Sequence, residues 1–128
     1  MTDKGFTLIE LVVVIVILGV LAATALPKFM DLRSDAASAA VRGVAGALSS
    51  ASTLNYSGRL VNTNNGVAVA NCQAVSNALQ GGLPGAPATY AIATLTVATS
   101  GTNNLATCTL SATISGGNYT AAFTALGT

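Results

Sequence analysis

The longest apolar run in the chain covers residues 6–26 and contains one charged side chain, Glu10. As an α-helix, a run of this length rises about 31 Å, which matches the hydrocarbon thickness of a bilayer. We therefore expect residues 6–27 to form a helix that can span a membrane. A carboxylate in such a segment is costly and requires a partner, which makes Glu10 a candidate functional residue.

Two residues are expected to weaken this helix near its end. Pro27 has no N–H, and its ring clashes with the carbonyl of Ala23, so a kink is expected there. Gly19 lowers the helix propensity of the same segment. The helical pattern nevertheless continues beyond Pro27.

Residues 28–56 are predicted to form the amphipathic second half of the helix. Apolar side chains recur every three or four positions, which predicts one buried stripe. Its expected members are Ala37, Val41, Val44, Leu48 and Ala51. A second stripe, expected to face solvent or neighbouring molecules, contains Asp31, Asp35, Ser38 and Arg42. The stretch Asn55-Tyr56-Ser57-Gly58 is predicted to end the helix.

A loop and a short helix are predicted over residues 57–87. Asn71 is a suitable N-cap for a helix over residues 72–80, because its side-chain oxygen can accept a hydrogen bond from a backbone N–H of the first turn. Gly81 and Gly82 follow this segment and are expected to stop the helix.

Residues 88–126 are predicted to form a small antiparallel sheet of three strands. The first covers residues 90–98, although its alternation slips near Thr94. The second covers residues 105–115, with an inward face of Cys108, Leu110, Ala112 and Ile114. The turn Ser115-Gly116-Gly117-Asn118 leads to the third, in which Tyr119, Ala121, Phe123 and Ala125 share a face. The sequence thus predicts an α+β fold, in which a long N-terminal helix packs against this sheet.

Charge is scarce, and its distribution argues against several functions. Only 7% of the residues are charged, the net charge is +1, and no charged residue follows Arg59. Nucleic-acid binding needs several Lys or Arg side chains together, so no specific nucleic-acid partner is expected. The chain has no His, and its C-terminal part has no paired carboxylates. We therefore expect neither a catalytic site nor a cofactor.

The residues Lys4-Gly5-Phe6-Thr7-Leu8-Ile9-Glu10 resemble the processing site of type IV pilins and of the related pseudopilins. The resemblance implies that a prepilin peptidase removes residues 1–5 by cleaving between Gly5 and Phe6, and that Phe6 is then N-methylated. It implies that the apolar helix is retained, first as an anchor in the bacterial inner membrane and then as the core of an extracellular fibre. The continuation over residues 25–36 looks most like mannose-sensitive haemagglutinin pilins.

The apolar run has two other interpretations. A secretory signal cleaved after Ala25 would discard the run and leave a soluble secreted domain. The second interpretation is a plain membrane anchor with a single span. Lys4 gives this interpretation only a weak positive-inside signal. The run is longer than an ordinary signal requires, which favours its retention.

The resemblance implies that the chain is the major structural subunit of a type IV pilus used for adhesion or motility. Residues 28–128 would form its globular domain, with the pilin fold. The implied partners are other copies of the chain, the prepilin peptidase and the pilus assembly machinery. The alternative within the same superfamily is a major pseudopilin of a type II secretion system. A surface with few charges suits a subunit that packs against copies of itself.

Glu10 has a specific role in this interpretation. It lies four residues after Phe6 and on the same helix face, so it could neutralise the new amino terminus of its own chain or of an adjacent copy. The resemblance favours the second pair, which would fix the stagger between helices because an unpaired carboxylate in an apolar core is costly. A capping role in the first helical turn is the alternative and is compatible with it. The resemblance also suggests that the segment between Gly19 and Pro27 loses its helix on assembly.

The two cysteines, Cys72 and Cys108, are predicted to form a disulfide, because an exported chain meets an oxidising compartment. The alternatives are a buried pair of free thiols or a metal site. Two thiols with no His and no nearby carboxylate are too few ligands for zinc, so no metal is expected.

Overall fold

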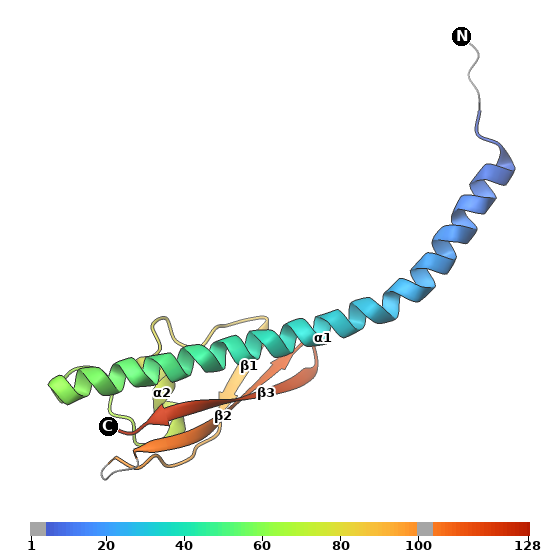
Figure 1. The fold of residues 1–128 in the computed structure, drawn as a ribbon. Coiled ribbons are helices and arrows are strands. Elements are labelled where there is room, and N and C mark those ends of the chain that lie inside the picture. The colour runs from blue at the N-terminus through green and yellow to red at the C-terminus, as the bar shows by residue number, and fades with distance from the viewer. Residues whose placement is uncertain (1–4, 100–103) are drawn as a thin grey trace. The chain divides into compact units, whose positions relative to one another are not determined.

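The computed structural model describes residues 5–99 and 104–128 (Figure 1). It contains helix α1 (Leu8–Val61), the 3-10 turn η1 (Cys72–Ala74), helix α2 (Val75–Ala78) and strands β1 (Ala88–Ile92), β2 (Leu105–Ile114) and β3 (Gly117–Leu126). The chain divides within α1 into two compact units, Met1–Asp35 and Ala36–Thr128. The expected leader, apart from Gly5, lies outside the described residues.

Helix α1 is continuous from Leu8 to Val61 and passes through Gly19 and Pro27 without a break. Before the proline, the hydroxyl of Thr24 donates to the carbonyl of Leu21 at 2.9 Å, so the side chain bonds within the preceding turn. The expected single helix of an unassembled chain is therefore confirmed, and the kink at Pro27 stays a prediction.

The predicted end of α1 near residue 56 is wrong, because the helix ends at Val61. Asn55 does not cap it. Its side chain instead binds the returning loop: the amide Nδ2 donates to the Val67 carbonyl at 2.8 Å, and the Val67 N–H donates to Oδ1 at 2.7 Å. Gly66 sits beside this amide with φ of +76°, and a Cβ there would collide with Asn55 Oδ1.

The buried stripe of α1 also differs from the prediction. Ala37, Val41 and Leu48 are buried as expected, but Val44 and Ala51 are only half-buried. The other buried members are Ala45, Ser52 and Asn55. The two polar residues continue the helical spacing of the stripe, and each makes hydrogen bonds that compensate for its burial.

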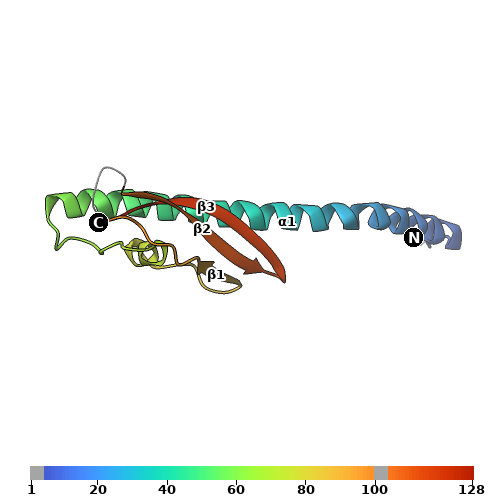
Figure 2. The same cartoon turned by 90° about the horizontal axis from the view of Figure 1, so that it is seen from below.

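Two serines connect α1 to the free edge of β3. The N–H of Thr124 donates to Ser49 Oγ at 3.0 Å, and that of Leu126 donates to Ser52 Oγ at 2.7 Å. The strand order is β1-β2-β3, so these donors have no neighbouring strand on that side. The helix therefore covers an edge that would otherwise expose unpaired backbone groups (Figure 2).

The hairpin of β2 and β3 confirms the predicted pairing. The strands run antiparallel, with register from Leu105 opposite Leu126 to Ile114 opposite Gly117. They are joined by two residues with positive φ, Ser115 at 50° and Gly116 at 82°, as the tightest hairpin turns require. The second and third strands present the predicted inward faces, on which Cys108, Leu110, Ala112, Phe123 and Ala125 are buried.

The first strand is displaced from its predicted range, because β1 covers Ala88–Ile92 and the chain leaves the sheet after Ala93, whose N–H still donates to the Thr109 carbonyl at 3.2 Å. The Cys72 N–H donates to the Leu95 carbonyl, and the Val97 N–H donates to the Ala70 carbonyl, both at 2.9 Å. Residues 95–97 thus pair with the segment before η1 instead of with β2. The slip in alternation near Thr94 marks the place where the strand ends.

The short helix is also smaller than predicted. Asn71 is the expected N-cap, and its side-chain oxygen accepts from the Ala74 N–H at 2.9 Å. The segment then forms η1 and one turn of α2, which ends at Ala78 because Leu79 is already extended. The predicted helix over residues 72–80 is therefore correct at its start and too long at its end.

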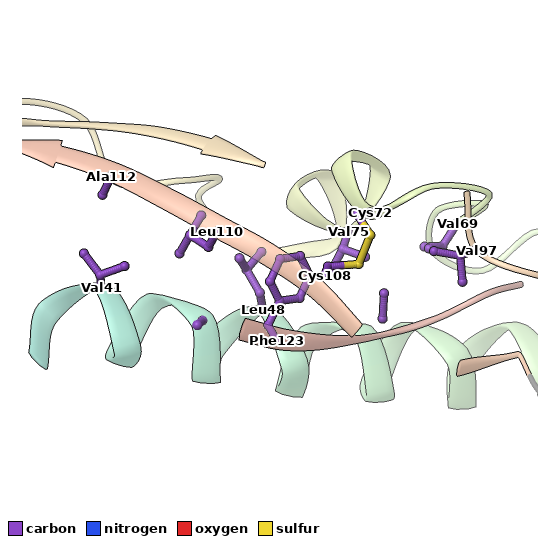
Figure 3. Close-up of a cluster of buried hydrophobic side chains, with 12 residues drawn as sticks. Val41, Leu48, Val69, Cys72, Val75, Val97, Cys108, Leu110, Ala112 and Phe123 are labelled. Atoms are coloured by element: carbon purple, nitrogen blue, oxygen red, sulfur yellow. A yellow bond between two sulfur atoms is a disulfide. The ribbon is translucent and has the colours of Figure 1, made fainter. Parts of the chain in front are cut away.

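The disulfide between Cys72 and Cys108 is confirmed and is buried in the core. It joins residues 36 positions apart and fastens η1 to β2, with 5.7 Å between the two Cα atoms. Figure 3 shows it beside Leu48, Leu110 and Phe123, which fill the space between α1 and the sheet. The alternatives of free thiols and of a metal site at these cysteines are thereby excluded.

Candidate processing and assembly segment

The first part of α1 presents an apolar surface that none of the described residues buries. Its most hydrophobic window has a mean hydropathy of 2.8 and no buried residue, and Leu8 is 80% exposed. By length and composition this helix can cross a membrane. An exposed apolar surface of this size is unfavourable in water, so it requires lipid or other protein surfaces around it.

The peptide bond between Gly5 and Phe6 lies just before this helix. Both residues are exposed and non-helical, and α1 begins at Leu8. A protease can therefore bind the backbone here without unwinding a helix. Gly5 has open space around the position where a Cβ would lie, so the fold itself does not require glycine at this position.

Glu10 forms a reciprocal cap with Thr7 at the start of α1. Its carboxylate oxygen Oε2 accepts from the Thr7 N–H at 2.9 Å and from the Thr7 hydroxyl at 2.6 Å. The Glu10 N–H in turn donates to the Thr7 hydroxyl oxygen at 3.3 Å. This arrangement is a capping box, so the structure confirms the capping alternative for a single chain. A pair between Glu10 and another copy stays a prediction.

The predicted site residues fall into three groups. Gly5, Phe6 and Glu10 lie together around the start of α1, where Phe6 and Glu10 line an open cavity of about 320 Å³ with Ile9, Val13 and Val14. Gly19 and Pro27 lie further along α1. They can affect the helix only through its backbone. The disulfide belongs to the second unit and serves its stability.

Sequence reasoning missed the polar residues that attach α1 to the rest of the second unit. Ser49, Ser52 and Asn55 all bond to backbone groups far away in the sequence. The positions of two of these residues in the sequence could have indicated their burial. Ser52 and Asn55 continue the helical spacing of Ala45 and Leu48. A polar residue on an otherwise apolar stripe indicates a buried hydrogen bond, but its partner cannot be read from local sequence.

Comparison with known proteins gives a consistent result. A family model described as the prokaryotic N-terminal methylation motif matches residues 1–26. The type IV narrow pilus major component PilA5 of Thermus thermophilus is 55% identical over 51 residues, which cover 40% of this chain and 44% of the relative. The type IV major alpha-pilin of Moraxella bovis is 54% identical over 41 residues, or 32% of this chain and 26% of the relative.

The matched segments therefore span less than half of each curated relative. No solved structure matches the chain. The motif match and both relatives nevertheless agree with the resemblance of residues 4–10. They support the interpretation of the chain as a type IV pilin with an N-terminal methylation motif.

Proposed function

We propose that this chain is the major, repeating subunit of a type IV pilus and that it polymerises through the first part of α1. The observation that carries the proposal is the exposed apolar surface of that helix, whose first part lies within the matched methylation motif, residues 1–26. Lipid can cover the surface before assembly, and other copies of the helix can cover it afterwards. The disulfide-bonded second unit would then form the outside of the fibre.

Maturation would begin in the bacterial inner membrane. The prepilin peptidase would cleave between Gly5 and Phe6, and Phe6 would be N-methylated. The exposed, non-helical backbone at this bond supports such a reaction. The pilus assembly machinery would then extract the subunit and add it to the extracellular fibre.

In the fibre, Glu10 would exchange its partner. The cap with Thr7 satisfies the carboxylate in a single chain, but processing creates a new amino group one residue before Thr7. In an apolar fibre core, the carboxylate would pair with the amino terminus of an adjacent copy. Only a correct stagger brings the two charges together, so the pair would select the register of assembly.

The finer identity of the pilus is also a proposal. The similarity of residues 25–36 to mannose-sensitive haemagglutinin pilins supports a pilus of that type, used for adhesion or motility. The scarcity of charge in the second unit, which contains Arg42 and Arg59 and no carboxylate side chain, suits subunits that pack closely.

Expression of the full chain in a piliated bacterium that lacks its own major pilin tests the function. Fibres sheared from the cells should contain the chain, and its intact mass should correspond to a start at Phe6 with one added methyl group. A chain that retains residue 1, or starts after Ala25, would contradict the maturation. Restored secretion in a strain lacking its major pseudopilin, without fibres, would favour the pseudopilin alternative instead.

A further inference from the structure

The segment of α1 that follows the apolar run exposes large apolar side chains. Residues 26–35 belong to the first compact unit, Met1–Asp35, and continue the helix without a break. Four of their side chains are more than half exposed: Leu26 at 66%, Phe29 at 68%, Met30 at 65% and Leu32 at 53%. Such a surface is unfavourable in water, so the segment needs apolar surroundings that the described residues do not provide.

The apolar and the charged side chains of this segment lie on different sides of α1. At 3.6 residues per turn, the four apolar residues fall within a sector of about 160°. Lys28, Asp31 and Asp35 fall within about 60° on the other side. Arg33 is the exception, because it lies on the apolar side between Phe29 and Leu26. An Arg side chain can bury its apolar stem and extend its guanidinium group into a polar layer, so this pattern fits the boundary between an apolar and a polar medium.

Arg33 has no carboxylate partner at the neighbouring positions of α1. The residues three and four positions away from it are Phe29, Met30, Ala36 and Ala37, none of which is acidic. Lys28, in contrast, lies three positions before Asp31. Arg33 is exposed, and a guanidinium group can bind phosphate oxygens through two parallel hydrogen bonds. A surface that offers both apolar chains and phosphate groups would therefore suit this side of the helix.

The distance of the segment from the apolar run matches the headgroup layer of a bilayer. Residues 6–26 already account for about 30 Å, the thickness of the hydrocarbon. The headgroup regions add about 5–8 Å on each side. Phe29, Met30 and Leu32 lie about 4–9 Å beyond Leu26 along the helix. They would therefore reach the headgroup level when the apolar run spans the membrane.

We propose that residues 26–33 of α1 form an anchor at the membrane surface. Phe29, Met30 and Leu32 contact the upper acyl chains of one phospholipid leaflet, and Arg33 binds headgroup phosphates. The inference rests on the proposed function, because it requires the apolar run to span the inner membrane before assembly. The anchor would hold the subunit at a defined depth, and extraction into the fibre would have to break these lipid contacts.

Depth-dependent quenching of a single tryptophan tests the anchor, because the chain has no Trp of its own. The full-length variant Phe29→Trp is reconstituted into vesicles of phosphatidylcholine and phosphatidylglycerol, with bromine atoms placed either near the headgroup or near the end of the acyl chains. We expect emission at a shorter wavelength than in water and stronger quenching by the shallow bromines.

Two matched variants calibrate this measurement. Leu18→Trp lies near the middle of the apolar run and should be quenched more strongly by the deep bromines. Leu54→Trp replaces a residue of α1 in the second unit that is 74% exposed, which is similar to Phe29. Its emission should resemble that in water and should escape both quenchers.

The phosphate contact is tested with Phe29→Trp as the reporter. Adding Arg33→Glu should shift the emission to a longer wavelength and weaken the shallow quenching, because a carboxylate is repelled by the anionic headgroups. Adding Arg42→Glu, the same change at an exposed position of the second unit, should alter neither signal. An unchanged signal for the Arg33 variant would overturn the phosphate contact.

Two further results would overturn the anchor while Leu18→Trp is quenched by the deep bromines. The first is an emission of Phe29→Trp like that of Leu54→Trp. The second is a loss of the Phe29→Trp signal when the subunit is diluted in lipid, which would show that second copies cover this segment instead of lipid. If Leu18→Trp also escapes quenching, the apolar run does not enter the bilayer, and the proposed function fails instead.

Discussion

At the scale of single residues, one buried amide determines how the chain returns to its helix. Asn55 satisfies both the N–H and the carbonyl of Val67 and is only 9% exposed. A side chain with both a donor and an acceptor is needed here, because Val67 offers one of each. The residue that looks like a helix end in the sequence is therefore a tertiary contact.

Replacement of Asn55 by Leu should destabilise the folded unit by about 2–4 kcal/mol. The change leaves the Val67 N–H unpaired, at a cost of about 1–3 kcal/mol, and leaves the Val67 carbonyl with only the Thr128 hydroxyl as donor, at 3.2 Å. Urea unfolding of the full chain in detergent measures the effect. The matched control is Asn64→Leu, an exposed position in the same loop, which should change stability by less than about 0.5 kcal/mol. Equal stabilities of the two variants would contradict this role of Asn55.

Gly5 gives the opposite case, in which we predict that a residue matters for processing and not for folding. A Cβ at this position meets no atom within 4 Å. We expect Gly5→Val to leave the unfolding midpoint of the second unit unchanged and to block removal of the leader. Mass spectrometry of the membrane-bound chain checks the second point. Normal cleavage of this variant would show that the peptidase does not read Gly5.

At the scale of elements, local patterns predicted the parts of the fold that local chemistry determines. The hairpin of β2 and β3 was predictable because strict alternation surrounds a turn whose residues accept positive φ. The N-cap at Asn71 depends on a partner three residues away and was equally readable. The N-terminal methylation motif was readable because its residues are contiguous.

The errors occur where distant segments compete for the backbone. The end of β1 depends on residues 95–97 pairing with residues 70–72, and Asn55, where α1 was predicted to end, binds Val67 instead. The serines that cover the β3 edge have partners more than 70 positions away. Hydrophobic periodicity contains no information about such bonds, which explains why the buried stripe was displaced and why Ser52 was not identified.

Removal of the Ser52 hydroxyl should weaken the attachment of α1 to the sheet. Ser52→Ala leaves the Leu126 N–H without its acceptor in a buried position, which should cost about 1–3 kcal/mol. Thr53→Ala is a suitable control, because Thr53 is an exposed neighbour whose hydroxyl bonds only within α1. Hydrogen exchange of the Leu126 amide should increase in the Ser52 variant alone. Unchanged protection of that amide would contradict the prediction.

Loss of the disulfide should have a larger effect than any of these hydrogen bonds. Cys72→Ser opens a link between positions 36 residues apart, for which the expected cost is about 2–5 kcal/mol. The effect should appear as a lower urea midpoint and should be reproduced in the wild-type chain by reduction. Reduced and oxidised wild-type chains with the same midpoint would show that the link adds no stability.

At the scale of the whole molecule, the proposed function places the two units in different environments before and after assembly. Before assembly, lipid around the first part of α1 cannot satisfy free backbone groups, so the segment between Gly19 and Pro27 must be helical there. The continuous helix of the single chain agrees with this requirement. Within a fibre, this segment is surrounded by other subunits instead of lipid, so its backbone is no longer required to be helical.

We therefore predict that the segment between Gly19 and Pro27 loses its helix in the fibre. Pro27 already leaves the Ala23 carbonyl without its usual donor, Gly19 favours the unfolded backbone, and the Thr24 hydroxyl can bond to a nearby carbonyl. Residues 8–18 and 28–61 should remain helical, because neither range contains proline and the second packs against the sheet. A fibre reconstruction checks this directly, with Pro27→Ala as the matched variant expected to resist extension and to assemble poorly. Unbroken helical density from Leu18 to Lys28 in wild-type fibres would show that assembly needs no such change.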